Sequence, residues 1–211
     1  MKRLIFAVLL GLFCGASLAA APVVSMSKPD QALLDNIMAS LSQHAAVRAD
    51  FVQTRSNPAL AKPQESTGKL LFVLGHGMLW RTLQPFTESL ALTGSHTSRL
   101  DAQGRFERVR DARGVSQVSQ MLQSLLAGQP DQVLRAFAVK ASGTVEQWTL
   151  VFTPKQARIA RVLGDITLTG DAFLEGIRID MHDGSSTDIR FSATRDAGPL
   201  DALEKRALDL P

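Results

Sequence analysis

The chain has 211 residues, 45% of them hydrophobic, with 23 lysines and arginines, 20 aspartates and glutamates and a single cysteine. This length suits one domain with a sizeable core, and one cysteine excludes an internal disulfide or a cysteine-based metal site. The small excess of positive charge predicts neither nucleic acid nor an anionic membrane as the partner.

The N-terminus has the pattern of a secretory signal peptide. Lys2 and Arg3 precede an apolar run from Leu4 to Phe13, and Ser17-Leu18-Ala19 supplies the small residues that signal peptidase accepts. The apolar run is shorter than a helix needs to span a bilayer, which argues against a membrane anchor. We therefore expect a signal peptide over residues 1–19 and export to the periplasm of a Gram-negative bacterium.

Cleavage after Ala19 changes the composition of the mature chain. It removes Cys14, and loss of Lys2 and Arg3 reduces the 23 basic residues to 21 against 20 acidic ones, a net charge of about +1. A lipoprotein signal is not expected, because Phe13 occupies the place of the small residue before Cys14. No linker, repeat or low-complexity tract follows, so residues 20–211 are predicted to form a single domain.

The first half of the mature sequence predicts one helix and then a β-meander. A helix begins near Pro29 and Asp30, with one apolar stripe formed by Leu33, Leu34, Ile37 and Leu41. From Val47 the apolar period changes to two. The expected strands are residues 47–52, 67–74, 78–83, 88–93, 98–101 and 105–110, with a hairpin turn at Gly75-His76-Gly77.

The second half predicts a helical interlude and then more strands. Residues 115–126 form an apolar helical stripe that ends before Gly128, and a short helix is expected at 130–135. Strands follow at 137–141 and 146–153, and another short helix starts at Pro154. The last expected strands are 165–169, 174–181 and 187–193, with Asp183-Gly184 as a hairpin turn.

The closing strands carry apolar side chains on one face only. Ile177 and Ile179 alternate with Arg178 and Asp180, which leaves the second face to solvent. Many such strands must roll up to cover their apolar faces, and the few helices are the natural cover. The predicted fold is therefore mainly β with helices (α+β): a strongly curved antiparallel sheet whose concave side is capped by the first helix and the 115–126 helix.

The sequence offers no catalytic or metal-binding pattern. His44, His76, His96 and His182 lie far apart without metal-ligand spacing, and Asp183 to Ser186 is better explained as a turn than as a nucleophile site. Phosphate-binding glycine motifs are missing, and the chain has no tyrosine for stacking on nucleic acid. We expect no enzyme activity, no catalytic residue, no metal and no cofactor; an esterase remains a distant alternative.

The most apolar stretch runs from Gly68 to Trp80. Alternation along its strands places every second side chain on a common face. The apolar stripe of the 115–126 helix is predicted to lie opposite that face. Such flexible apolar side chains suit an adaptable cavity, although an ordinary core would use the same residues. The candidate ligand-binding residues are Leu70, Phe72, Leu74, Met78, Trp80, Met121, Leu122 and Leu125.

Two sequence motifs, found in a fixed order along the chain, support the prediction of an apolar ligand cavity. "FVQTR" at Phe51 to Arg55 and "TGKLLFVLGHGMLWRTLQP" at Thr67 to Pro85 resemble the LolA-type periplasmic carriers of outer-membrane lipoproteins. The matching positions are Phe51, Gln53, Gly68, Trp80 and Pro85. "WTLVFTP" at Trp148 to Pro154 and the closing hairpin at Gly184 to Phe191 are similar to the second half of that family, so the resemblance covers nearly the whole mature chain.

The resemblance implies a half-closed antiparallel barrel with helices as a lid over a hydrophobic cavity that accepts acyl chains. It also implies that Leu74 stands where typical carriers have an arginine that holds the lid shut, and that the C-terminal extension used in delivery is missing. The expected function is a periplasmic carrier or chaperone that shelters the acyl chains of a lipoprotein or another lipid-like ligand. The partners would be that ligand and envelope membrane proteins, and the protein would be a monomer. The alternative is a structural or protein-docking module.

Overall fold

The computed structural model describes residues 27–94, 96–101, 103–109, 121, 123–125 and 131–211. The N-terminal half of these residues contains α1 Lys28–Leu41, β1 Ala46–Ser56, β2 Gln64–Val73, β3 Gly77–Gln84, β4 Glu88–Thr93, β5 Thr97–Leu100 and β6 Phe106–Arg108. The C-terminal half contains α3 Asp131–Ala136, β7 Phe137–Gly143, β8 Trp148–Pro154, α4 Ala157–Ala160, β9 Leu163–Gly170, β10 Leu174–Met181, β11 Ser186–Asp196 and α5 Ala202–Ala207.

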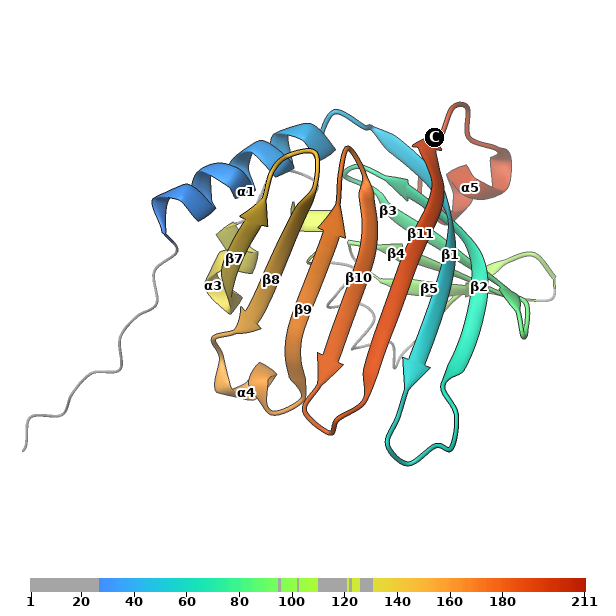
Figure 1. Ribbon diagram of the computed structural model, residues 1–211. Helices are drawn as coiled ribbons and strands as arrows, with labels where there is room; N and C mark the ends of the chain where they lie inside the picture. The colour runs from blue at the N-terminus through green and yellow to red at the C-terminus, as the bar shows by residue number, and fades with distance from the viewer. Residues whose placement is uncertain (1–26, 95, 102, 110–120, 122, 126–130) are drawn as a thin grey trace, which may run out of the picture.

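The strands in this described part form one antiparallel sheet of eleven members, in the order β6-β5-β4-β3-β2-β1-β11-β10-β9-β8-β7 (Figure 1). Strands that lie side by side in the sheet are also consecutive in the sequence, except at one place, where β1 pairs with β11. Two meanders are therefore joined along the β1–β11 seam. The sheet curves strongly but does not close, because β6 and β7 lie at opposite edges. The predicted fold class is confirmed.

The main hydrophobic core lies on the concave side of the sheet. α1 begins at the N-cap Ser27, whose hydroxyl accepts a hydrogen bond from the Asp30 N–H at 3.3 Å. Its apolar stripe is buried against the sheet and packs next to β7. Residues 121 and 123–125 are helical, and Met121 and Leu125 belong to the same core. The rest of the predicted 115–126 helix lies outside the described residues.

A second, smaller core lies on the convex side over β2, β3 and β4. Leu71, Val73, Leu79 and Ala91 pack there against Ala207 and Leu208 of the C-terminal segment. Because successive strand residues point to opposite faces, the stretch from Gly68 to Trp80 fills both cores at once. The expected solvated face of the closing strands is present on β10 and β11, where Arg178 and Arg190 are exposed, whereas β2 to β4 are covered on both faces.

α5 is fixed to the convex side by a buried carboxylate. Asp201 and Glu204 form a capping box, in which Asp201 accepts from the Glu204 N–H at 2.8 Å and Glu204 accepts from the Asp201 N–H at 2.9 Å. Glu204 is only 4% exposed, and its carboxylate also accepts hydrogen bonds from both terminal nitrogens of Arg48 on β1. The distance from Arg48 Nη2 to Glu204 Oε2 is 2.8 Å. Arg48 Nε further donates to the Ala197 carbonyl at 2.9 Å. This bidentate ion pair ties the chain end to the centre of the sheet.

Two local differences from the sequence prediction have simple reasons. α5 is not among the elements that periodicity predicts, although Asp201-x-x-Glu204 is a capping signal, because a helix of six residues is too short to show a clear apolar period. β8 continues through Pro154, whose missing N–H is tolerated at the end of a strand, so α4 begins only at Ala157. Among the described helices, none is long and apolar enough to cross a membrane.

The Arg48–Glu204 pair predicts a pH-dependent contribution to stability. Hydrogen bonding from Arg48 lowers the pKa of Glu204 below its ordinary value of 4.5, so the stabilisation is fully present above that value and is lost as the pH falls through the lowered pKa. Glu204→Gln should reduce the free energy of unfolding at neutral pH by about 1.5–3 kcal/mol. The variant should also lose less stability than wild type on acidification. Urea unfolding at several pH values measures both effects.

Glu88→Gln is the matched control. Glu88 also pairs with an arginine, at 2.7 Å from Arg99, but both side chains are partly open to solvent, so its loss should cost under about 1 kcal/mol. Equal losses of stability for the two variants would show that α5 is not held by its buried carboxylate.

Candidate functional site

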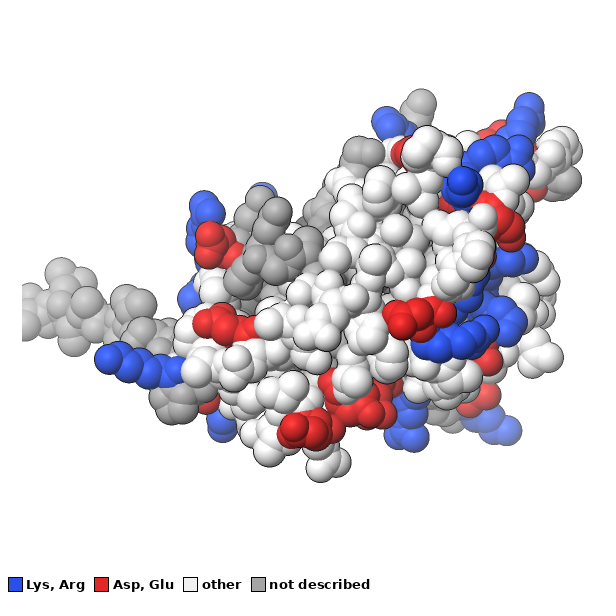
Figure 2. All heavy atoms as spheres, turned by 90° about the horizontal axis from the view of Figure 1, so that it is seen from above, with Lys and Arg blue, Asp and Glu red and all other residues white. Residues whose placement is uncertain are grey.

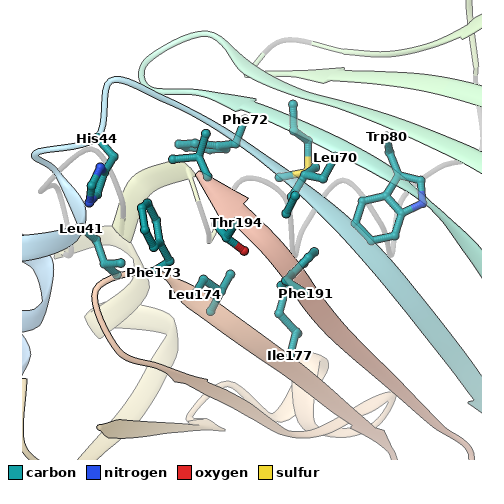
Figure 3. Close-up of a pocket in the computed structure, with 13 residues that line it drawn as sticks. Leu41, His44, Leu70, Phe72, Trp80, Phe173, Leu174, Ile177, Phe191 and Thr194 are labelled. Carbon is teal, nitrogen blue, oxygen red and sulfur yellow. The ribbon is translucent and has the colours of Figure 1, made fainter. Parts of the chain in front are cut away.

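A cavity opens on the concave side between the two halves of the sheet (Figure 3). Its volume is about 70 Å³. Strands β1, β2 and β3 supply one wall, β10 and β11 supply the facing wall, and the α1–β1 and β9–β10 connections border its mouth. The lining residues are almost all apolar: Leu41, His44, Val47, Ala49, Leu70, Phe72, Met78, Trp80, Phe173, Leu174, Ile177, Phe191 and Thr194.

The structure brings most of the predicted site residues to one region. Leu70, Phe72, Met78 and Trp80 line the cavity, and Leu74 packs against the same core without lining it. Met121 and Leu125 are buried in this core, 5% and 1% exposed, away from the lining. Leu122 lies outside the described residues.

The facing wall was not predicted as part of a site. Its large side chains are Phe173, Leu174, Ile177 and Phe191. The period-two pattern does show that Ile177 and Phe191 lie on a buried face. Only the pairing of β1 with β11, between the two ends of the chain, places that face opposite Leu70 and Phe72. Local periodicity carries no information on such a long-range pairing.

A glycine and two aromatic rings hold Trp80 at the cavity wall. Gly68 lies directly opposite Phe51 in the β1–β2 register. A Cβ atom on Gly68 would lie 2.0 Å from the Arg81 carbonyl oxygen and 2.6 Å from the Phe51 ring, so only glycine fits. Phe51 crosses this gap and stacks on Trp80, with ring centroids 3.9 Å apart. Phe191 meets Trp80 edge-on at 6.4 Å from the facing wall.

In the second meander, a glycine likewise leaves room for the ring of Trp148. Gly170 is the register partner of Trp148, and a Cβ atom there would lie 2.4 Å from the indole. The Trp148 Nε1–H donates to the Asp171 carbonyl at 2.7 Å, which satisfies its only polar group. Trp148 is 2% exposed and is not among the cavity-lining residues. The two tryptophans therefore report on different parts of the core.

Only two of the residues that line the cavity have polar side chains. His44 and Thr194 are the polar lining residues, and His44 Nδ1 lies 2.8 Å from Asp196 Oδ1. Seen from above, the molecule has a broad uncharged area with acidic side chains in it and basic side chains toward its edges (Figure 2). Within the described ranges, no three His, Cys, Asp or Glu side chains lie close enough to hold a metal ion. This arrangement can enclose an apolar group and offer a few hydrogen bonds at one end.

Comparison with known proteins gives one family and several structural neighbours. Residues 26–202 match the family described as outer membrane lipoprotein carrier protein LolA-like. No curated protein matches the chain in sequence. The LolA superfamily protein from Nitrosomonas europaea is 8% identical, with 83% of this chain and 96% of that chain covered and a TM-score of 0.49.

Two further neighbours are also distant in sequence. The MucA/MucB complex of Pseudomonas aeruginosa is 12% identical, with 82% of this chain and 59% of that chain covered and a TM-score of 0.46. A putative outer membrane lipoprotein-sorting protein domain from Vibrio parahaemolyticus is also 12% identical, with 85% and 99% covered and a TM-score of 0.44.

The packing around Gly68 predicts a coupled change in stability and in Trp80. In Gly68→Ala, the added methyl group must displace the Phe51 ring or the Arg81 backbone, which should destabilise the protein by about 1–3 kcal/mol. It should also alter Trp80 fluorescence, because the Phe51 stack is lost. Gly94→Ala is the control, since its Cβ would meet nothing closer than 3.8 Å. A Gly68→Ala protein as stable as the control, with unchanged fluorescence, would contradict this packing.

Proposed function

Because the chain belongs to the family of LolA-like outer membrane lipoprotein carrier proteins, we propose that it is a periplasmic carrier. It shelters the acyl chains of a lipoprotein or another lipid-like ligand during transport toward the outer membrane. The observation that supports this proposal most is the apolar cavity between the two meanders. Moving a chain from water into such a site is favourable by about 0.8 kcal/mol per methylene group.

The size of the cavity indicates how a ligand would enter. A water molecule needs about 10–15 Å³ of such space, so the present volume of about 70 Å³ accommodates only a few waters. A long acyl chain therefore requires the lining to move outward. The unclosed sheet and the flexible Leu and Met side chains of the lining allow this movement.

We assign the lid to the helices on the concave side. α1 is held there by apolar contacts of Leu34, Ile37, Met38 and Leu41, which can separate from the sheet without breaking buried hydrogen bonds. Leu74, where the resembling carriers have an arginine, offers only an apolar side chain and donates its backbone N–H to the Ala45 carbonyl at 2.9 Å. A lid of this kind opens more easily than one closed by side-chain hydrogen bonds, which suits release of the ligand.

Native mass spectrometry of the protein isolated from its own periplasm tests the carrier function. A co-purifying lipid or acylated protein is the expected result. Repeated recovery of the bare protein, together with failure to bind fatty-acyl probes, would contradict the carrier function and favour a structural or protein-docking module of the envelope.

A charge placed in the lining should prevent uptake. In Phe72→Glu, the new carboxylate would replace a side chain that is 7% exposed and lines the cavity, and burial of an unpaired charge is costly. The folded variant should bind a fluorescent fatty-acyl probe at least about tenfold more weakly than wild type. Circular dichroism checks that the variant is folded, and fluorescence titration compares its affinity for the probe with that of wild type.

Val52→Glu is the matched control for this substitution. Val52 lies on β1 with its side chain 41% exposed, so the same carboxylate remains in solvent. This variant should bind the probe as wild type does. Unchanged binding by folded Phe72→Glu would show that the cavity is not the ligand site.

A further inference from the structure

The seam between β1 and β11 contains an irregularity next to the cavity. Arg48 pairs with Arg195 and Asp50 pairs with Ser192, so the single residue Ala49 faces two residues of β11, Ala193 and Thr194. This is a β-bulge. Ala193 has a φ angle of +50°, a left-handed conformation that residues with a side chain rarely adopt. Such strain persists only where the surrounding structure enforces it, and it is common next to functional sites.

The bulge changes which side chains of β11 face the cavity. Phe191 lines the cavity, and regular alternation from it would turn Ala193 and Arg195 inward. The extra residue shifts the alternation by one position. Thr194 therefore lines the cavity, and Asp196 lies on the same side, where it meets His44. An apolar wall thus ends in a hydroxyl and a carboxylate at the mouth.

Thr194 and His44 each have a polar atom that makes no hydrogen bond within the described part of the chain. The Thr194 hydroxyl has no hydrogen-bond partner among the described residues, and its oxygen points into the cavity (Figure 3). His44 Nδ1 lies 2.8 Å from the Asp196 carboxylate, which can only accept a hydrogen bond when ionised, and this pairing leaves Nε2 as the second hydrogen-bonding atom of the ring. The His44 ring is oriented further by Phe173, at a centroid distance of 4.3 Å. No partner of Nε2 lies in the described part of the chain.

We propose that Thr194 and His44 bind the polar head of the ligand and that Asp196 positions His44. This subsite rests on the proposed carrier function and specifies its cargo: an acyl amphiphile whose head is uncharged and carries hydroxyl or amide N–H groups. His44 Nε2 can hydrogen-bond such a head, and the Thr194 hydroxyl can donate or accept a hydrogen bond. An anionic head is disfavoured, because the lining contains no lysine or arginine and Asp196 is 73% exposed at the mouth.

The charge around the mouth supports an uncharged head in a second way. The nearest arginine along β11, Arg195, points to the opposite side and donates to the Ala193 carbonyl at 3.0 Å. Arg48 of β1 is held on the convex side by Glu204. The arginines beside the bulge are therefore directed away from the cavity, and the bulge itself keeps Arg195 out of it.

A matched pair of lipids tests the subsite: a monoacylglycerol and the same monoacylglycerol carrying a phosphate. The two share the acyl chain and the glycerol, and they differ in the phosphate, which replaces one uncharged hydroxyl by an anionic group. Wild type should bind the uncharged lipid several-fold more tightly in competition with a fluorescent acyl probe. An N-acylated peptide with uncharged side chains tests an acylated protein as the source of the same chemistry. Its affinity relative to the monoacylglycerol distinguishes acylated protein from free lipid.

Thr194→Val keeps the shape of the side chain and removes its hydroxyl. It should weaken monoacylglycerol binding about three- to tenfold, the effect of one lost hydrogen bond, while the phosphate lipid changes little. Asp196→Asn, at an exposed position, should strengthen binding of the phosphate lipid. Thr167→Val, on the solvent side of β9, is the control and should bind both lipids as wild type does.

The outcomes separate this subsite from the carrier function. Binding of both lipids with equal affinity, or unchanged monoacylglycerol binding by Thr194→Val, would overturn the subsite and leave the carrier function standing. If no acyl ligand binds to wild type, the carrier function and the subsite are both wrong.

Discussion

The pairing of β1 with β11 is the constraint on which the rest of the structure depends. It joins two meanders that otherwise contain only local hairpins, and it brings the apolar faces of β2 and β3 opposite those of β10 and β11. The inner face of β1 supplies Val47 and Ala49 to the cavity, and its outer face supplies Arg48 to anchor α5. Because the pairing joins distant parts of the chain, the two walls of the cavity face each other only once β1 and β11 have paired.

The two halves of the sheet are covered differently, and this difference bears on the proposed opening of the cavity. β2 to β4 are packed on both faces, by the main core inside and by the α5 segment outside. β10 and β11 are packed on one face only, with arginines and aspartates outside. The wall that bears Trp80 is therefore the better supported one, and expansion of the cavity is expected to come from α1 and the β10–β11 wall.

Periodicity in the sequence predicted most elements, because most strands alternate regularly and several of the hairpin turns contain a glycine, as at Gly75, Gly104 and Gly184. β4 and β10 have the expected bounds, and Leu70, Phe72, Met78 and Trp80 were placed together from the alternation of two neighbouring strands. Three features needed the structure. α5 depends on an ion pair with Arg48, the β10–β11 wall depends on the seam, and the bulge at Ala193 has no glycine to mark it.

The position of a bound acyl chain can be measured with the two tryptophans of this protein, since brominated acyl chains quench an indole that they touch. Trp148→Phe leaves only Trp80, which lines the cavity, and Trp80→Phe leaves only Trp148, which is buried elsewhere in the core. A brominated monoacylglycerol should quench Trp80 strongly and Trp148 weakly. Binding that quenches neither, or that quenches Trp148 as strongly as Trp80, would contradict a ligand site between the two walls.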